Sequence, residues 1–178
     1  MRDQLLAALI DVVPFAASDA FKIVEIGSGD GGLTEALLGR FPRATIVALA
    51  PSESERFTLS ARLARFADRV DVRPFTLEAL GWWDVMVGAG LVVSLLQLLA
   101  LNDAKKRYLF KAAAERLADD GALIVGDRLQ PQTLLHHLVW LKHAGFAAVD
   151  CYWMSAAHAV FGGVKRAAAS EAPLRADN

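Results

Sequence analysis

An acidic residue and three glycines alternate at the end of an apolar run near the N-terminus: Glu25, Gly27, Gly29 and Gly31. A helical pattern follows, and a strand, a glycine turn and a helix together place backbone N–H groups beside a nucleotide. Glycine accepts positive φ and lets a ligand lie directly against the backbone. A carboxylate that ends a buried strand needs a partner, because an unpaired buried charge is costly. A cationic ligand would supply that partner, directly or through water and backbone N–H groups, so the pattern indicates a nucleotide site that favours positive charge.

Two other interpretations of the turn remain open. Gly27, Gly29 and Gly32 satisfy G-x-G-x-x-G, the fingerprint of NAD-binding oxidoreductases, although the position of Glu25 is normally apolar in that motif. A tight glycine turn in an ordinary α/β protein would need no ligand.

The elements that position these residues alternate short apolar runs with amphipathic segments, which is typical of parallel α/β proteins. The last two strands are joined by a loop too short for a crossover helix, so they must pair antiparallel. We expect a three-layer α/β/α sandwich with a mostly parallel, seven-stranded Rossmann-like sheet that ends in an antiparallel β-hairpin. Ser52 and Glu55 have the spacing of a capping box, and Pro74 places the third strand at an edge. The strands are expected at 21–26, 45–49, 70–74, 83–87, 122–125, 147–153 and 159–164, and the helices at 2–13, 33–38, 52–66, 104–117 and 134–144.

The acidic glycine turn, the five β/α units and the terminal hairpin resemble class I S-adenosylmethionine (SAM)-dependent methyltransferases over roughly residues 21–165. The resemblance implies SAM as the cofactor, with its cationic sulfonium and α-amino groups, and methyl transfer to a small-molecule acceptor. Pure dinucleotide-binding domains lack the hairpin, which disfavours the oxidoreductase. The cofactor contacts that the resemblance implies are Glu25, Gly27, Ser28, Gly29, Gly31, Ala50, Pro51, Ser52, Phe75, Thr76 and Gly88.

One departure from the family's pattern concerns the cofactor's ribose. The second strand of these enzymes usually ends in an acidic residue that accepts hydrogen bonds from both ribose hydroxyls, and the corresponding residue here is Ala50. A charged acceptor contributes about 1.5–3 kcal/mol. We therefore expect SAM binding to be weakened by about ten- to a hundredfold, or to be absent, unless Ser52, Glu53 or Glu55 replaces the acid. The alternative function is a catalytically degenerate methyltransferase-like protein that acts as a binding or assembly partner.

A second departure follows the third strand, where the family commonly has an Asp at the adenine edge. Here Thr76 would supply a hydroxyl, and Phe75 or Leu77 would pack on the purine face. The glycines Gly88 and Gly90, after the expected fourth strand, would permit close approach of the methionine moiety, with a flexible loop as the alternative.

Catalytic groups are scarce. Asp127 ends the fifth strand, where α/β sheets bind their ligands, and it is the one weak candidate, with a loop or cap residue as the alternative. His136 and His137 begin the next helix, point different ways, and are expected to be surface or N-terminal helix residues rather than ligands. With His143 they form no metal-binding spacing, so no metal site is expected.

Length and composition favour one domain, residues 1–166, with 1–20 as an N-terminal helix and lead-in and 167–178 as a disordered tail. A net charge of −1 with scattered basic residues argues against nucleic-acid binding. The single Cys151 fits a reducing compartment, and the longest apolar run is too short to span a membrane, so a cytoplasmic protein without a membrane partner is expected. A hydrophobic content of 54% favours a surface that is buried in a homo-oligomer.

Overall fold

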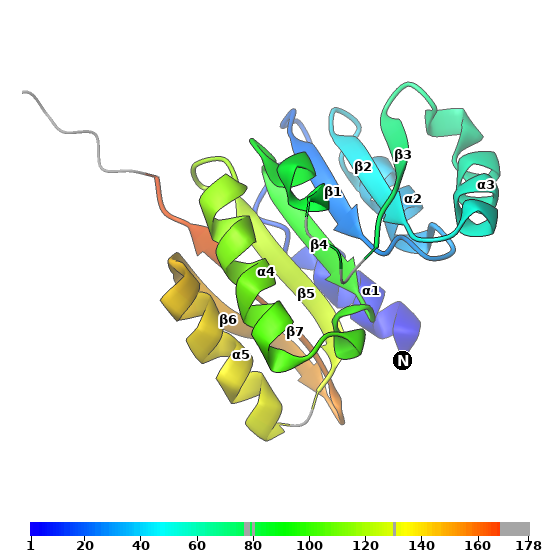
Figure 1. Cartoon of the computed structure of the whole chain (residues 1–178). Helices are drawn as coiled ribbons and strands as arrows, with labels where there is room; N and C mark the ends of the chain where they lie inside the picture. Colours follow the sequence, from blue (N-terminus) through cyan, green and yellow to red (C-terminus); the bar gives the residue numbers. More distant parts are fainter. Residues whose placement is uncertain (77–78, 80, 130, 168–178) are drawn as a thin grey trace, which may run out of the picture.

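A seven-stranded sheet with strand order β3-β2-β1-β4-β5-β7-β6 forms the centre of this computed structural model, which describes residues 1–76, 79, 81–129 and 131–167 (Figure 1). The first five strands pair in parallel, whereas β7 is antiparallel to both β5 and β6. This arrangement confirms the expected mostly parallel sheet and its terminal hairpin. The strands are β1 Lys22–Ile26, β2 Thr45–Ala50, β3 Val70–Pro74, β4 Leu91–Leu95, β5 Ala122–Arg128, β6 Phe146–Ser155 and β7 His158–Lys165.

Helices cover both faces of the sheet and bury one apolar cluster on each side. The helices α1 (Arg2–Asp11), α2 (Gly32–Arg40) and α3 (Glu53–Arg62) contribute to one cluster, in which Leu5, Leu37 and Leu59 are fully buried. The helices α4 (Asp103–Arg116) and α5 (Pro131–Ala144) bury the other cluster. Figure 1 looks onto the face covered by α4 and α5, with α1 and α2 behind the sheet. The result is the predicted three-layer sandwich.

The fourth strand lies later in the chain than predicted. Residues 82–86 form a 3-10 helix, Trp82–Met86, and the strand is Leu91–Leu95, between β1 and β5. The two tryptophans stack on each other and pack against Phe75 and Tyr108, which holds this segment against α4 instead of in the sheet. All residues of β4 are buried, and a short apolar run without alternation cannot be told from a buried helical segment by its pattern.

Local signals at the element ends agree with the structure. The capping box of α3 is confirmed, because Glu55 N donates to Ser52 Oγ and Ser52 N donates to the Glu55 carboxylate. The helix ends at Arg62, and a separate 3-10 turn, Ala64–Phe66, occupies the rest of the predicted span. The strand β3 lies at one edge of the sheet, as Pro74 indicated.

Parts of the predictions fall on residues that are not described. Leu77 lies outside the described residues, and so does the predicted tail from residue 168 onward. Within the described part of the chain, no helix is both long and apolar enough to cross a bilayer.

Candidate functional site

The glycine turn connects the carboxyl end of β1 to the first turn of α2. Gly27, Gly29 and Gly31 have φ values of 74°, 53° and 79°, a backbone region that favours glycine. Ser28 N donates to Leu49 O at 2.9 Å, which ties the turn to the neighbouring strand β2. The turn therefore lies at the carboxyl ends of the parallel strands, where α/β proteins bind their ligands.

A cavity of about 160 Å³ lies beside this turn. Four of the predicted cofactor-contact residues share its wall: Glu25, Gly27, Ser28 and Gly29. The volume is below the roughly 300–1,000 Å³ of ordinary ligand pockets, so it matches one part of a nucleotide cofactor. The described residues that line it are Arg2, Glu25, Gly27, Ser28, Gly29, Leu33, Leu95, Leu96 and Gln97.

The carboxyl group of Glu25 is buried in this wall, with 1% of the residue exposed. Burial raises its pKa to about 7, whereas the hydroxyls of Thr34 and Ser28 act in the opposite direction. Thr34 Oγ1 donates to Glu25 Oε2 at 2.5 Å. Close to neutral pH the carboxyl group is thus poised between its neutral and ionised forms. Sequence reasoning missed Thr34, although its place in the first turns of the helix after the glycines was a usable signal.

Ser28 offers an unused polar atom in the same cavity. Its Oγ is buried and makes no hydrogen bond of ordinary geometry to any described residue, although it lies close enough to Glu25 to lower that residue's pKa. Buried hydroxyls are normally hydrogen-bonded. A polar group of a ligand in this cavity would satisfy both Ser28 and Glu25.

Gln97 is the wall residue that the sequence did not reveal. Its side chain lies against the backbone of Gly27, and a Cβ on Gly27 would approach Gln97 Cδ to 2.6 Å and Oε1 to 2.7 Å. The preceding residue, Leu96, has φ = 60°, a strained value for a residue with a Cβ. Because the fourth strand was predicted too early, this segment lay outside the expected site.

The expected ribose position lacks a free acceptor. Ala50 is completely buried in the cluster with α1 and α2. Its carbonyl and that of Pro51 accept hydrogen bonds from Arg56 Nη1, at 3.3 and 3.1 Å. Ser52 and Glu55 are engaged with each other in the capping box. The positive charge of Arg56 therefore stands close to where the resemblance places an acid.

The remaining predicted cofactor contacts do not gather around the cavity. Phe75 is 7% exposed and packs edge-on against Trp82, with ring centroids 5.4 Å apart, while Thr76 is exposed. Gly88 precedes β4, and its neighbour Gly90 donates to the carbonyl of Lys22 at the start of β1. Gly88 thus lies at the opposite end of the sheet from Gly27, because the true fourth strand begins after it.

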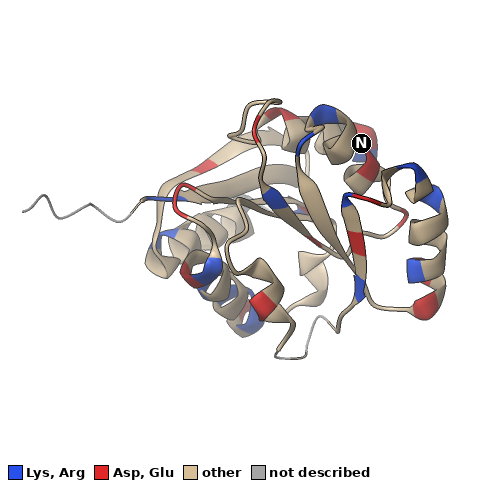
Figure 2. Cartoon of the chain, turned by 90° about the horizontal axis from the view of Figure 1, so that it is seen from above, with Lys and Arg blue, Asp and Glu red and all other residues tan. Residues whose placement is uncertain are grey.

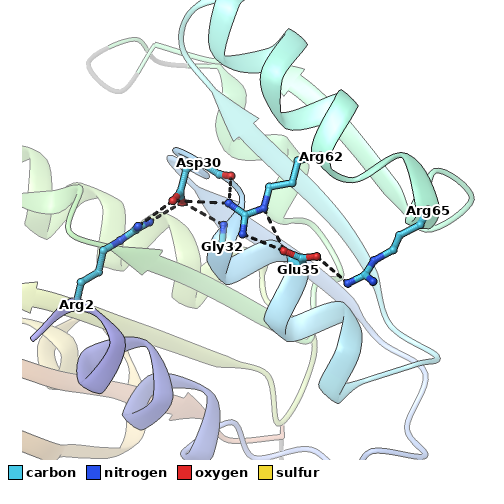
Figure 3. A network of polar contacts seen from close by, with 6 residues as sticks. All are labelled: Arg2, Asp30, Gly32, Glu35, Arg62 and Arg65. Atoms are coloured by element: carbon cyan, nitrogen blue, oxygen red, sulfur yellow. Dashed lines mark hydrogen bonds and ion pairs between the residues drawn. The ribbon is translucent and has the colours of Figure 1, made fainter.

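A chain of ion pairs braces the glycine turn from outside (Figure 3). Asp30 accepts two hydrogen bonds from Arg2, at 2.8 and 2.5 Å, and a third from Gly32 N. The hydrogen bonding of Arg2 holds the pKa of Asp30 well below its usual range. Arg62 bridges the carbonyl of Asp30 to Glu35, which also binds Arg65. The network joins the first turn of α1 and the end of α3 to the glycine turn. Figure 2 shows basic and acidic residues interspersed over the chain.

Asp127, the predicted catalytic candidate, is 1% exposed and satisfied by the backbone. It accepts a hydrogen bond from Arg128 N at 2.7 Å, and the backbone of Leu98 and of Leu99 lies close enough to lower its pKa. Burial raises its pKa. These contacts join the end of β5 to the loop after β4, a structural role that agrees with the loop-residue alternative.

The two adjacent histidines of α5 differ in their surroundings. His136 is exposed as expected, but the expectation was wrong for His137, which is 1% exposed. His137 Nδ1 donates to Thr133 O at 2.6 Å, and burial lowers the pKa of the ring. Successive residues of a helix point in different directions, so one histidine enters the core and the next stays outside. The described residues contain no group of three His, Cys, Asp or Glu side chains placed to bind a metal ion.

Comparisons with known proteins identify the fold. No family model matches this sequence, and no curated protein matches it either. Solved structures do match. An O-methyltransferase family protein from Burkholderia thailandensis aligns with a TM-score of 0.71 and 16% identity, over 93% of this chain and 58% of that one.

Two further structures show the same relationship. Human N-acetylserotonin methyltransferase in complex with SAM gives a TM-score of 0.68 and 15% identity, over 91% of this chain and 52% of that one. A precorrin-6y methyltransferase from Geobacter metallireducens gives a TM-score of 0.69 and 15% identity, over 92% of this chain and 88% of that one. This chain therefore spans little more than half the length of the first two proteins. It has the class I SAM-dependent methyltransferase fold, which confirms the resemblance at the level of the fold.

Proposed function

We propose that this protein binds SAM and transfers its methyl group to a small-molecule acceptor. The observation that carries the proposal is the buried Glu25, whose carboxyl group lies in a cavity wall with Gly27, Ser28 and Gly29. A buried carboxyl group with a pKa near 7 is stabilised in its ionised form by a cationic partner. The α-amino group of SAM is such a partner.

The chain's own residues fit the methionine end of the cofactor better than its ribose end. Glu25 and the unpartnered Ser28 Oγ would hold the amino acid group, while open space beside Gly29 admits the cofactor along the backbone. At the ribose, Ala50 offers no side-chain acceptor and Arg56 engages the nearby carbonyls. We therefore expect affinity to depend mainly on the Glu25 end of the site.

When bound, SAM supplies a methyl group on a sulfonium, and its in-line displacement leaves a neutral thioether. Such a displacement depends on positioning more than on an acid. The protein's contribution is to orient the cofactor through the glycine turn, which the network of Arg2, Asp30 and Arg62 holds in place. A general base is required only if the acceptor must lose a proton.

A second candidate function is a methyltransferase-like binding or assembly partner without catalysis. Two observations favour it: Gln97 occupies the space above Gly27, and Arg56 stands where an acid would bind the ribose. Either feature weakens the binding of a complete cofactor.

Titration calorimetry with SAM and S-adenosylhomocysteine tests the proposal. The wild type should bind both, and Glu25→Gln should weaken binding by about tenfold or more, because a charged hydrogen bond is lost. Glu115→Gln, an exposed position near the end of α4, is the matched control. Equal affinity of the wild type and Glu25→Gln would contradict the assigned role of Glu25. The absence of any binding would favour the non-catalytic candidate, and labelled methyl transfer to any extract component would exclude it.

A further inference from the structure

A second cavity, of about 350 Å³, lies beyond the loop that carries Gln97. The helix α4, the start of α5, the end of β5 and the turn between β6 and β7 all contribute to its lining. Its volume falls within the roughly 300–1,000 Å³ of small-molecule sites. The lining residues are Leu99, Lys106, Arg128, Leu129, Thr133 and Ala157.

The cavity combines two cations with apolar walls. Lys106 is 6% exposed, which is unusual for a lysine, and it is one of the residues that line the cavity. Among the described residues, Lys106 Nζ forms neither an ion pair nor a side-chain hydrogen bond. A lysine that lines a largely apolar cavity can form charge-assisted hydrogen bonds with the anionic group of a ligand.

The nearest buried carboxylate does not neutralise Lys106 by contact. The carboxylate of Asp127 accepts a hydrogen bond from Arg128 N and forms no ion pair with Lys106, whose charge acts on it only at a distance. Arg128 adds a second cation at the exposed side of the cavity, and Thr133 adds a hydroxyl group. Leu99, Leu129 and Ala157 supply the surface for an apolar body.

We infer that this cavity binds a small organic acid, with the carboxylate between Lys106, Arg128 and Thr133 and the apolar body against Leu99 and Leu129. In the proposed function, this organic acid is the methyl acceptor. The role of this acid as methyl acceptor rests on the proposed function. The binding of an organic acid beside Lys106 is independent of methyl transfer.

The test compares benzoate with benzamide, which has the same shape without the charge, by titrating each into isotope-labelled protein and following backbone amide NMR signals. Benzoate should shift the signals of Arg128, Leu129 and Thr133 and should bind at least about tenfold more tightly than benzamide. Lys106→Met should remove this preference. Lys105→Met, its exposed neighbour on the same helix, should keep it.

The variant Lys106→Met removes a buried charge and keeps an unbranched side chain, so it should remain folded. Equal binding of benzoate and benzamide, no binding of either at millimolar concentration, or full benzoate affinity in Lys106→Met would overturn the inference. Benzoate binding that depends on Lys106, without any SAM binding, would refute the proposed function and leave this site standing.

Discussion

The side chain of Gln97 lies directly on the backbone of Gly27, in the space that a glycine keeps open for a ligand. Gln97 follows β4 and Gly27 follows β1, and the pairing of these two parallel strands brings the residues together. Nucleotides bind glycine turns by close contact with the backbone. A nucleotide that binds Gly27 in this way must displace the Gln97 side chain. The strained backbone of Leu96 marks the place where this segment is forced into its conformation.

Replacing Gln97 with Ala should strengthen binding of S-adenosylhomocysteine. The smaller side chain leaves the space above Gly27 free, so the displacement and ordering of a glutamine are avoided, a gain of up to about tenfold in affinity. Calorimetry measures the change, with Gln132→Ala on the exposed side of α5 as the control. Weaker binding by Gln97→Ala would show instead that Gln97 contacts the cofactor.

The free energy of unfolding should fall as the pH rises from about 4.5 to about 7, because burial raises the pKa of Glu25 over this range in the folded state. In this window the folded protein holds more protons than the unfolded chain, so stability is present at low pH and is lost as the pH rises. The difference between the pKa of 4.5 in the unfolded chain and about 7 in the folded protein corresponds to a loss of roughly 3 kcal/mol in the free energy of unfolding.

In Glu25→Gln this contribution to the pH dependence should disappear, while the amide oxygen still accepts from Thr34. Urea unfolding at several pH values measures it, and the variant should exceed the wild type in stability at pH 8. A wild type and a variant whose stabilities change in parallel with pH would refute the assignment of the raised pKa to Glu25.

An acid at position 50 should improve cofactor binding only when Arg56 is also changed. The side chain of residue 50 lies in the buried apolar cluster, so in Ala50→Asp we expect the new carboxylate to pair with the Arg56 guanidinium, which already bonds the carbonyls of Ala50 and Pro51. In that ion pair, the carboxylate oxygens would accept hydrogen bonds from Arg56 and would no longer be free to accept them from the ribose hydroxyls. We expect little effect of Ala50→Asp or Arg56→Gln alone, and about tenfold tighter S-adenosylhomocysteine binding in the double variant.

Calorimetry compares the wild type, the two single variants and the double variant. Thermal unfolding checks that the protein tolerates the carboxylate at the buried position 50. A single Ala50→Asp change that already tightens binding would mean that Arg56 does not compete for the acid.

The terminal hairpin offers a test of backbone strain. Ala156 has φ = 50° in the two-residue turn between Ser155 and His158, where a residue with a Cβ is disfavoured. Ala156→Gly should stabilise the protein by about 1 kcal/mol. Ala157→Gly, the next residue of the same turn, should be neutral or destabilising. Urea unfolding compares the two, and a loss of stability in Ala156→Gly would contradict the strained turn.

Local patterns in the chain were enough to define the strands around the glycine turn, the capping box of α3 and the antiparallel hairpin. Each depends on residues close in sequence: apolar runs bounded by turn residues, a Ser52–Glu55 spacing, or a loop too short for a crossover. The fourth strand was placed too early because the run 83–87 resembles a buried strand. The packing of Trp82 and Trp83 against Phe75 and Tyr108 instead keeps this segment out of the sheet. That single error removed Gln97 from the expected site and put Gly88 into it.

Contacts between distant segments decided the rest of the site. Glu25 was recognisable as an unusual acid, but its raised pKa follows from complete burial, which outweighs the opposite effect of the hydrogen bond from Thr34 on the next helix. Neither Arg56 on the carbonyl of Ala50 nor Lys106 in its cavity has a signature in its own neighbourhood of the chain. Periodicity and turn chemistry act over a few residues and define elements, whereas desolvation and side-chain pairing arise only when the sheet brings those elements together.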